Sequence, residues 1–403
     1  MKLSEELVWR GFVAENTLKN VSDLDERARS FYWGTDPSAD SLHVGHLAAL
    51  MMCACFIRYG YKPYLLVGGA TGQIGDPKDN AERDLKPMDE IEHNKAALVA
   101  QIRQVVQEEN VVMVDNWDWF REIKYIDFLR TVGKEFSMTQ LLDRKFVQDR
   151  VGEGGVGISY AEFSYSLIQG YDFLHLYREY GIDMQLCGAD QFGNCVSGMH
   201  LIKRLEGAEA DAWSCPLIID QASGRKFGKS EGNAVWLDAE KTPVFDFYQF
   251  WLNQSDDAVE DYLKYYTLMM PDELAELMAA HFERPQDRLA QKRLAEEATT
   301  VVHGREATES VIKITTVLFG KMDVDTLSEA DISLLEKTIP TVGRGANISE
   351  ALVSTGVAKS KSEARQLIVS DAISVNNEKV GEDIEIAQRA IIKKGKNKFI
   401  LVK

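Results

Sequence analysis

Hydrophobic positions in the first part of the chain form short and long runs in alternation. Short apolar runs of strand length occupy 29–36 (RSFYWGTD) and 62–69 (KPYLLVGG). Between them, the longer apolar stretch 44–60 has the length of a helix and ends at Gly60. A strand, a helix and a second strand in so short a span favour a βαβ unit. The pattern therefore predicts an α/β fold with a parallel, Rossmann-like sheet.

The same alternation continues and then gives way to helices alone. The pattern predicts helices at 89–109 and 161–181, a helix from near Asp190, and strands at 111–115, 182–188 and 216–220. From 244 to about 320 the periodicity is helical throughout. We therefore expect a helical part after the α/β part.

Composition narrows the class of protein. The chain has 403 residues, of which 45% are hydrophobic and 27% charged, and no apolar run is long enough to cross a membrane. Its first residues, MKLSEELVWRGF, lack the features of a signal peptide. Five cysteines without C-x-x-C spacing favour free thiols, and the seven histidines lack metal-ligand spacing. We expect a cytoplasmic location and no structural metal.

Charge is distributed unevenly along the chain. The net charge is −17, which argues against general binding of nucleic acid. Residues 341–403 nevertheless contain 11 Lys/Arg and 7 Asp/Glu, so this end is basic while the rest is strongly acidic. The pattern predicts that one small module meets a polyanion.

Polar side chains follow the predicted strands. His43 and His46 flank Gly45 at the start of a helix, where an anion can bind and a flat base can approach the backbone. A helix cap and a packed histidine are the simpler interpretation of this motif alone. Asp76 ends the glycine-rich stretch 68–77 (GGATGQIGDP), which an ordinary turn would also explain.

Two more groups belong to the second α/β stretch. Tyr165, Gln169 and Asp172 are spaced to share one helix face, which indicates a polar pocket wall or an exposed face. Asp190 and Gln191 follow the strand predicted at 182–188. Because open α/β sheets bind ligands at the carboxyl ends of their strands, the groups together predict one site.

Two glycine motifs are misleading. The stretch 224–230 (GRKFGKS) is one residue short of a P-loop and is not followed by a helix, so we interpret it as a mobile loop that closes over a polyphosphate. Gly152, Gly154 and Gly157 match a dinucleotide fingerprint, but the charged residues before them do not form a buried strand. We interpret that stretch as a loop.

The ordered set of motifs resembles a known family. HVGH and KFGKS are similar to the two signatures of class I aminoacyl-tRNA synthetases. Together with GGATGQIGDP, EFSYSLIQGYDF and CGADQFGN they resemble the bacterial-type tyrosyl-tRNA synthetases, and 349–380 is similar to their S4 RNA-binding module. The resemblance runs from about residue 7 to the C-terminus.

The resemblance implies a domain order and a role for each matching residue. It implies a catalytic domain with a connective insertion at 1–220, a KFGKS loop region at 221–243, an anticodon-binding helical domain at 244–325, a linker at 326–345 and an S4-like domain at 346–403. The tyrosine phenol would bind Tyr32 and Asp172, its ammonium would bind Asp76, Tyr165 and Gln169, and its carboxylate would lie near Gln191. The ATP site would comprise Gly34, Asp36, His43, Gly45, His46, Asp190, Lys226, Lys229 and Ser230, with His43, His46, Lys226 and Lys229 catalytic.

Substrates and partners follow from the same resemblance. ATP with Mg²⁺, tyrosine and tRNA(Tyr) are expected, as is a homodimer with 120–138 near the subunit contact. In the basic module the RNA contacts are expected at Lys359, Lys361, Arg365, Lys393 and Lys394, although a solvated lysine face is the alternative.

The sequence departs from the family pattern at a few positions. The stretch after Asp76 is one residue short, which leaves the register of Lys78 and Arg83 open, and Phe192 replaces a common tryptophan. A tryptophan-specific relative and an inactive RNA-binding paralogue are the alternatives. The pair Tyr32 and Asp172 argues against the first, and the intact signatures argue against the second.

Overall fold

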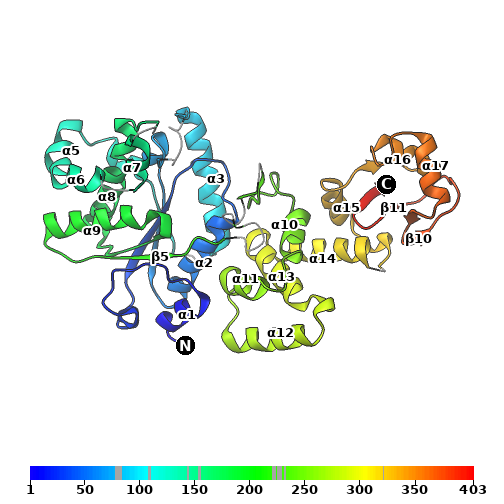
Figure 1. Ribbon diagram of the computed structural model, residues 1–403, viewed down its shortest axis with the longest axis horizontal. Coiled ribbons are helices and arrows are strands. Elements are labelled where there is room, and N and C mark those ends of the chain that lie inside the picture. Colours follow the sequence, from blue (N-terminus) through cyan, green and yellow to red (C-terminus); the bar gives the residue numbers. More distant parts are fainter. Residues whose placement is uncertain are drawn as a thin grey trace. The chain divides into compact units, whose positions relative to one another are not determined.

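The chain folds into two compact units. The computed structural model describes residues 1–77, 84–107, 110–142, 145–152, 156–219, 224, 229–230, 233–320 and 322–403. Unit 1 comprises Met1–Asp238 and Asp256–Arg284, and unit 2 comprises Ala239–Ser255 and Pro285–Lys403. Figure 1 shows the elements of both.

Unit 1 is built on a five-stranded parallel sheet, as the sequence predicts. The strand order is β3-β2-β1-β4-β5, and every neighbouring pair is parallel. The strands are β1 (Ser30–Thr35), β2 (Lys62–Val67), β3 (Val112–Val114), β4 (Met184–Gly188) and β5 (Asp211–Cys215). Because the chain moves to opposite sides of β1 to form β2 and β4, the strand order reverses beside β1, where such sheets bind ligands.

Helices cover both faces of this sheet. Side chains alternate between the two faces of a strand, so Tyr32 and Tyr64 join the apolar cluster on α8 (Tyr160–Tyr180) and α9 (Phe192–Glu206). On the other face, Phe31 packs on Phe56 of α2 (Val44–Arg58), with ring centroids 5.7 Å apart. In Figure 1, α2 and α3 (Met88–Val106) lie on the other side of the sheet from α8 and α9.

The prediction of a strand at 216–220 is wrong for its described residues, 216–219, which belong to no strand of the sheet. The fifth strand of this sheet is β5, which ends at Cys215, just before the predicted range. Residues Ala212 to Cys215 are buried, although the sequence of β5, DAWSC, is not an apolar run. Pro216 has no N–H to continue the ladder. Pro216, Leu217 and Ile218 instead line the cavity described below.

A helical excursion follows β3. It comprises α4 (Trp117–Phe120), α5 (Tyr125–Thr131), α6 (Met138–Leu142) and α7 (Lys145–Val151). The glycine motif at 152–157 thus follows a helix, which agrees with rejecting a dinucleotide fingerprint; residues 153–155 lie outside the described part.

The helices predicted between 244 and 320 are present but divide between the units. α11 (Val259–Tyr266) and α12 (Pro271–Glu283) belong to unit 1. There the buried guanidinium of Arg10, at the end of α1 (Leu3–Arg10), donates to the carbonyls of Lys264 and Thr267 at 2.7 Å and of Met269 at 2.8 Å. These bonds satisfy carbonyls at the end of α11 that have no partner within the helix.

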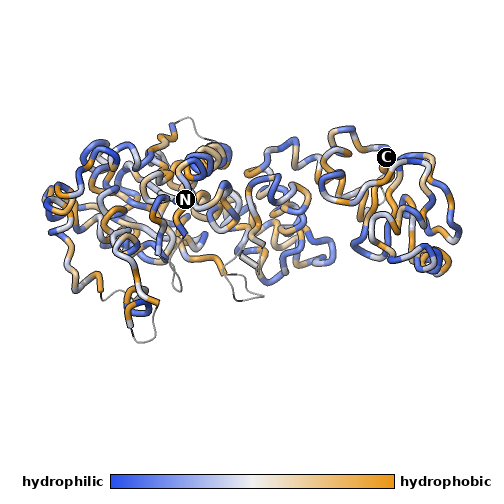
Figure 2. The backbone as a smooth tube through the Cα atoms, turned by 90° about the horizontal axis from the view of Figure 1, so that it is seen from above, coloured by the Kyte–Doolittle hydropathy of each residue, from blue (hydrophilic) through white to orange (hydrophobic). Residues whose placement is uncertain are grey.

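Unit 2 holds the remaining helices and a second sheet. Its helices are α10 (Val244–Leu252), α13 (Leu289–His303), α14 (Arg305–Phe319), α15 (Glu329–Glu336), α16 (Ile348–Ser354) and α17 (Lys361–Val369). The sheet has the order β10-β9-β11-β12-β8, with strands Glu378–Lys379, Ile373–Val375, Ala390–Lys394, Lys398–Val402 and Thr341–Val342. Figure 2 shows hydrophobic and hydrophilic stretches alternating along the chain, as expected for elements with one buried face.

The small C-terminal α+β module is therefore present. The range expected as a linker, 326–345, contains α15 and β8, and β8 joins the module's sheet beside β12. The domain boundaries drawn from the sequence stay a prediction. None of the helices in the described ranges has the length and apolar character needed to cross a membrane.

Candidate active site

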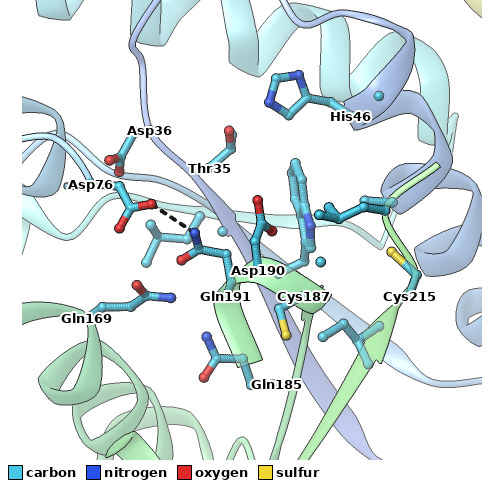
Figure 3. Close-up of a pocket in the computed structure, with 18 of the residues that line it drawn as sticks. Thr35, Asp36, His46, Asp76, Gln169, Gln185, Cys187, Asp190, Gln191 and Cys215 are labelled. Atoms are coloured by element: carbon cyan, nitrogen blue, oxygen red, sulfur yellow. Dashed lines mark hydrogen bonds between the residues drawn. The ribbon is translucent and has the colours of Figure 1, made fainter. Parts of the chain in front are cut away.

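A cavity of about 280 Å³ opens at the carboxyl ends of β1 and β4. Figure 3 shows side chains from these strands, from α2 and from α8 turned toward it. The cavity brings together twelve of the predicted site residues: Tyr32, Gly34, Asp36, His43, Gly45, His46, Asp76, Tyr165, Gln169, Asp172, Asp190 and Gln191.

One end of the cavity is made by Tyr32 and Asp172, both 2% exposed. Both oxygens of the Asp172 carboxyl group accept a hydrogen bond: Oδ2 from Asn116 Nδ2 at 3.1 Å and Oδ1 from Trp119 Nε1 at 3.0 Å. The hydroxyl of Tyr32 has no hydrogen-bond partner among the described residues, although Gln185 lies beside it. This end therefore holds a fixed acceptor and an unsatisfied hydroxyl.

Burial dominates the electrostatics of this end. It raises the pKa of Asp172 well above the usual carboxyl value, while the bonds from Asn116 and Trp119 lower the pKa and offset part of that shift. Burial also raises the pKa of Tyr32, and the nearby Cys195 and Asp172 raise it further. The phenol of Tyr32 is therefore a neutral hydroxyl that can donate to or accept from a ligand.

The middle of the cavity is acidic. Tyr165 donates its hydroxyl to Asp36 Oδ2 at 2.9 Å, and Gln191 Nε2 donates to Asp76 Oδ2 at 2.9 Å. Figure 3 shows Asp36, Asp76 and Asp190 around the same space. Such a group of carboxylates suits a cationic ligand group.

The loop that carries Asp76 is fastened to the end of β3. Asp115 Oδ1 accepts from Gly69 N at 2.8 Å, and Asn116 Oδ1 accepts from Ala70 N at 2.7 Å. A Cβ atom on Gly69 would lie 2.6 Å from Asp115 Oδ1, so this approach requires glycine. Asn116 thus joins the Asp76 loop to Asp172.

The other end of the cavity lies at the N-terminus of α2. His43 is the N-cap residue and its Nδ1 accepts from Gly45 N at 3.0 Å, while His46 Nδ1 lies 3.3 Å from the N–H of His43. A neutral imidazole whose Nδ1 accepts a hydrogen bond carries its proton on Nε2. His43 therefore does cap the helix, as the simpler interpretation of the motif has it. The bonds accepted by the Nδ1 atoms of His43 and His46 also leave both imidazoles as Nε2–H donors.

The returning end of the KFGKS loop is tied to the same helix. Val44 N donates to Val235 O at 3.0 Å, and the His43 and Trp236 rings pack edge to face with their centroids 6.2 Å apart. Lys229 and Ser230 lie in β6 (Lys229–Ser230), which pairs with β7 (Asn233–Ala234). Lys226, and likewise Lys78 and Arg83, lie outside the described residues.

Several residues of the site are not predicted from the sequence. Asn116 directly follows the predicted strand 111–115, so the rule that singled out the other strand ends would have found it, whereas Trp119 lies three residues further on and carries no such signal. Gln185 and Thr71 also line the cavity. Gln185 lies inside a strand, where a lone buried glutamine carries no sequence signal.

The residues predicted to bind RNA differ in their exposure and in the contacts that they already make. Lys359 is exposed, and the side chains of Lys361 and Arg365 are exposed although they face Glu350 and Asp383. Lys393 Nζ donates to Leu318 O at 3.3 Å and lies over the Phe399 ring at 5.2 Å. Lys394 Nζ donates to Val357 O at 3.0 Å. The last two lysines therefore already have partners within unit 2.

Comparisons with known proteins identify the class. Residues 24–320 match the family described as tRNA synthetases class I (W and Y), and residues 331–402 match the tyrosine–tRNA ligase SYY-like C-terminal domain. A tyrosine–tRNA ligase of Ligilactobacillus salivarius is 39% identical, with all of both chains covered. Tyrosine–tRNA ligase 2 of Bacillus cereus is 42% identical, again with all of both chains covered.

A solved structure agrees with these relatives. The mitochondrial tyrosyl-tRNA synthetase of Coccidioides posadasii, truncated at its C-terminus, has a TM-score of 0.69 and 28% identity over 78% of this chain and 92% of that one. A tryptophanyl-tRNA synthetase of Encephalitozoon cuniculi shares the fold, with a TM-score of 0.56 and 13% identity over 82% of this chain and 91% of that one. The chain belongs to the tyrosyl-tRNA synthetases, within the class I tRNA synthetases. The reaction of this family is a two-step aminoacylation.

Proposed function

We propose that this cavity holds tyrosine and ATP end to end and joins them as tyrosyl-adenylate. The tyrosine carboxylate attacks the α-phosphorus and pyrophosphate leaves. A hydroxyl of the terminal ribose of tRNA(Tyr) then attacks the tyrosyl carbonyl, and AMP leaves. The observation that carries this proposal is the buried Tyr32 hydroxyl without a described partner, beside the fixed Asp172 carboxyl group.

A phenol suits this end of the cavity chemically. Buried polar groups without a partner cost about 1–3 kcal/mol each, so a ligand that supplies the missing partner is favoured. A phenol O–H can donate to Asp172 and accept from Tyr32, whereas phenylalanine can do neither. An indole has one N–H donor and no acceptor, so it can bond only one of these two groups at a time, which argues for tyrosine over the tryptophan that related enzymes of this class take.

The acidic middle of the cavity suits the amino group of the substrate. Asp76, Tyr165 and Gln169 would hold the α-ammonium, and Gln191 would lie by the carboxylate. Gln169 Oε1 is buried without a hydrogen bond to any described residue, so it is available as an acceptor. The order phenol, ammonium, carboxylate then leads from Asp172 toward α2.

The end at α2 suits the nucleotide. The Nε2–H groups of His43 and His46 and the helix N-terminus would stabilise charge on the phosphates. Gly45 would allow the base to approach the backbone. Gly34 and Asp36 would lie on the nucleotide side, Asp190 would bind the ribose, and Lys226, Lys229 and Ser230 would bind the pyrophosphate.

This chemistry requires positioning rather than a base. The carboxylate nucleophile is already ionised, so the site must align it and stabilise phosphate charge. Mg²⁺ would accompany ATP and be held mainly by the phosphates, because no group of three or more His, Cys, Asp or Glu side chains in the described ranges is arranged to hold a metal. The absence of a structural metal stays a prediction.

Assembly as a homodimer is part of the proposal. The excursion after β3 exposes large apolar side chains, among them Tyr125 at 60%, Ile126 at 69% and Met138 at 57%. Neighbouring exposed apolar side chains are typical of protein interfaces. A sedimentation mass of one chain at micromolar concentration would contradict this part.

ATP–pyrophosphate exchange tests the proposed activity. We expect exchange that depends on tyrosine and is not supported by tryptophan or phenylalanine at the same concentration. Exchange driven by tryptophan would point to the other specificity of this class, and no exchange with either amino acid would contradict the proposal.

A further inference from the structure

We propose that His175 is a positioning residue for tyrosine recognition: by stacking on Trp119 it sets the direction of the hydrogen bond from Trp119 to Asp172. This inference rests on the proposed function of the cavity.

The imidazole of His175 lies flat on the indole of Trp119. Their ring centroids are 4.4 Å apart and their planes differ by 21°, which is a stacked geometry. The same indole donates Nε1–H to Asp172 Oδ1 at 3.0 Å. Asp172 and His175 lie one turn apart on α8. The Trp119 indole therefore contacts both: its edge donates a hydrogen bond to Asp172 and its face stacks on His175.

The two donors to Asp172 are held in different ways. Asn116 is fixed by two further hydrogen bonds: its Oδ1 accepts from Ala70 N at 2.7 Å and its Nδ2 donates to Thr71 Oγ1 at 3.0 Å. Trp119 comes from α4, a helix of four residues, and is only partly buried. Because an indole has a single donor, the orientation of its ring decides where Nε1–H points. Trp119 also packs against the apolar cluster on α8 and α9, and the stack on His175 is the contact that lies flat on its ring and so limits its rotation.

The surroundings of His175 suit a neutral, packed ring. Burial lowers the pKa of His175, with Arg178 lowering it and Glu179 raising it, so the imidazole is uncharged near pH 7. The ring of Tyr171 is also near, with its centroid 6.2 Å from that of His175, and it belongs to an aromatic cluster with Phe120 and Phe128. This cluster fastens the excursion after β3 to α8.

The test compares tyrosine and phenylalanine in ATP–pyrophosphate exchange by the full-length enzyme. Aromatic pairs are worth about 0.5–1.5 kcal/mol, which corresponds to about a 2- to 12-fold change. We expect His175→Ala to lower the tyrosine-to-phenylalanine ratio of kcat/KM by about this factor, through the KM for tyrosine, with the KM for ATP unchanged. His175→Phe keeps a flat ring and should restore the ratio.

Two comparisons separate positioning from folding. In a Trp119→Phe background the donor is gone, so His175→Ala should change the ratio less than about 2-fold. Tyr180→Ala is the control, because it removes a different aromatic contact of α8, that of Tyr180 with Tyr64, whose ring centroids are 5.2 Å apart. It should leave the tyrosine-to-phenylalanine ratio at the wild-type value.

If the wild type shows exchange, either of two results would overturn the inference. One is an unchanged ratio in His175→Ala, and the other is a His175→Phe variant as impaired as His175→Ala. Absence of exchange in the wild type would instead overturn the proposed function.

Discussion

At the scale of single residues, specificity depends on how buried polar groups are satisfied. Asp172 receives two hydrogen bonds and Tyr32 receives none from described residues, so the first is fixed and the second awaits a partner. A site that loses a substrate hydroxyl leaves such groups unpaired in a dry pocket. A discrimination of about 10⁵-fold, itself the known value for a tyrosyl-tRNA synthetase, sets the scale of this effect.

Removing the hydroxyl of Tyr32 should separate recognition from stability. We expect Tyr32→Phe to lower the tyrosine-to-phenylalanine ratio of kcat/KM by about 5-fold, since one neutral hydrogen bond is worth roughly 1 kcal/mol. The melting temperature without ligand should not fall, because no described hydrogen bond is lost. A lowered melting temperature with an unchanged ratio would show that the hydroxyl serves the fold instead.

The raised pKa of Asp172 should appear in the pH dependence of selectivity. A raised pKa means that the ionised form is lost at higher pH than for an ordinary carboxyl group, near 3.9. As pH falls through this pKa, the acceptor for the phenol is lost and an unpaired charge no longer penalises phenylalanine. The tyrosine-to-phenylalanine ratio of kcat/KM should therefore fall on acidification, beginning above pH 4. A ratio that is constant down to pH 4 would contradict the assignment.

The helix period explains which site residues the sequence predicts. Tyr165, Gln169 and Asp172 share one face of α8, and all three reach the cavity as their spacing indicates. Trp119 and His175 could not be assigned in this way, because their importance depends on a contact between two elements far apart in the sequence. A periodic pattern within one element does not contain that contact.

At the scale of elements, the ends of the strands decide where chemistry occurs. β1, β4, the loop after β2 and one face of α8 supply the acidic and polar groups, and the N-terminus of α2 supplies the imidazoles. The sequence predicts four of the five strands near their observed positions because each is an apolar run. It misplaces β5, since the strand DAWSC is recognisable only by its pairing with β4.

The two lysines of the KFGKS motif should act on the chemical step. We expect Lys226→Ala and Lys229→Ala to lower kcat for pyrophosphate exchange by about 10²-fold or more, because grip on the leaving group strengthens in the transition state. Tyrosine binding, measured at equilibrium, should change little. Lys203→Ala is a suitable control, since this exposed lysine pairs with Glu209 on the surface. Unchanged exchange in both variants would remove these lysines from the mechanism.

At the scale of the whole molecule, charge separates two tasks. An acidic body carries the small-molecule site, whereas residues 341–403 carry 11 Lys/Arg against 7 Asp/Glu. Sequence alone predicts this division, but not which lysines are available. Lys393 and Lys394 are held within unit 2, which is visible only in three dimensions.

Charge reversal in the basic module should affect only the second step. We expect Lys359→Glu with Arg365→Glu to weaken tRNA charging, and to make it less dependent on salt, while pyrophosphate exchange stays at the wild-type rate. Lys62→Glu serves as the control, because it reverses the charge of an exposed lysine of β2, which is outside this module. It should leave tRNA charging unchanged. Equal loss of both activities in the double variant would argue against a separate RNA-binding module.

A crystal structure with tyrosine and a non-hydrolysable ATP analogue would show whether one cavity holds both substrates end to end. We expect the phenol oxygen within hydrogen-bond distance of Tyr32 and Asp172, and the α-phosphate beside His43 and His46, in the same cavity. A tyrosine bound with its ring toward α2, or elsewhere on the chain, would rule out this arrangement.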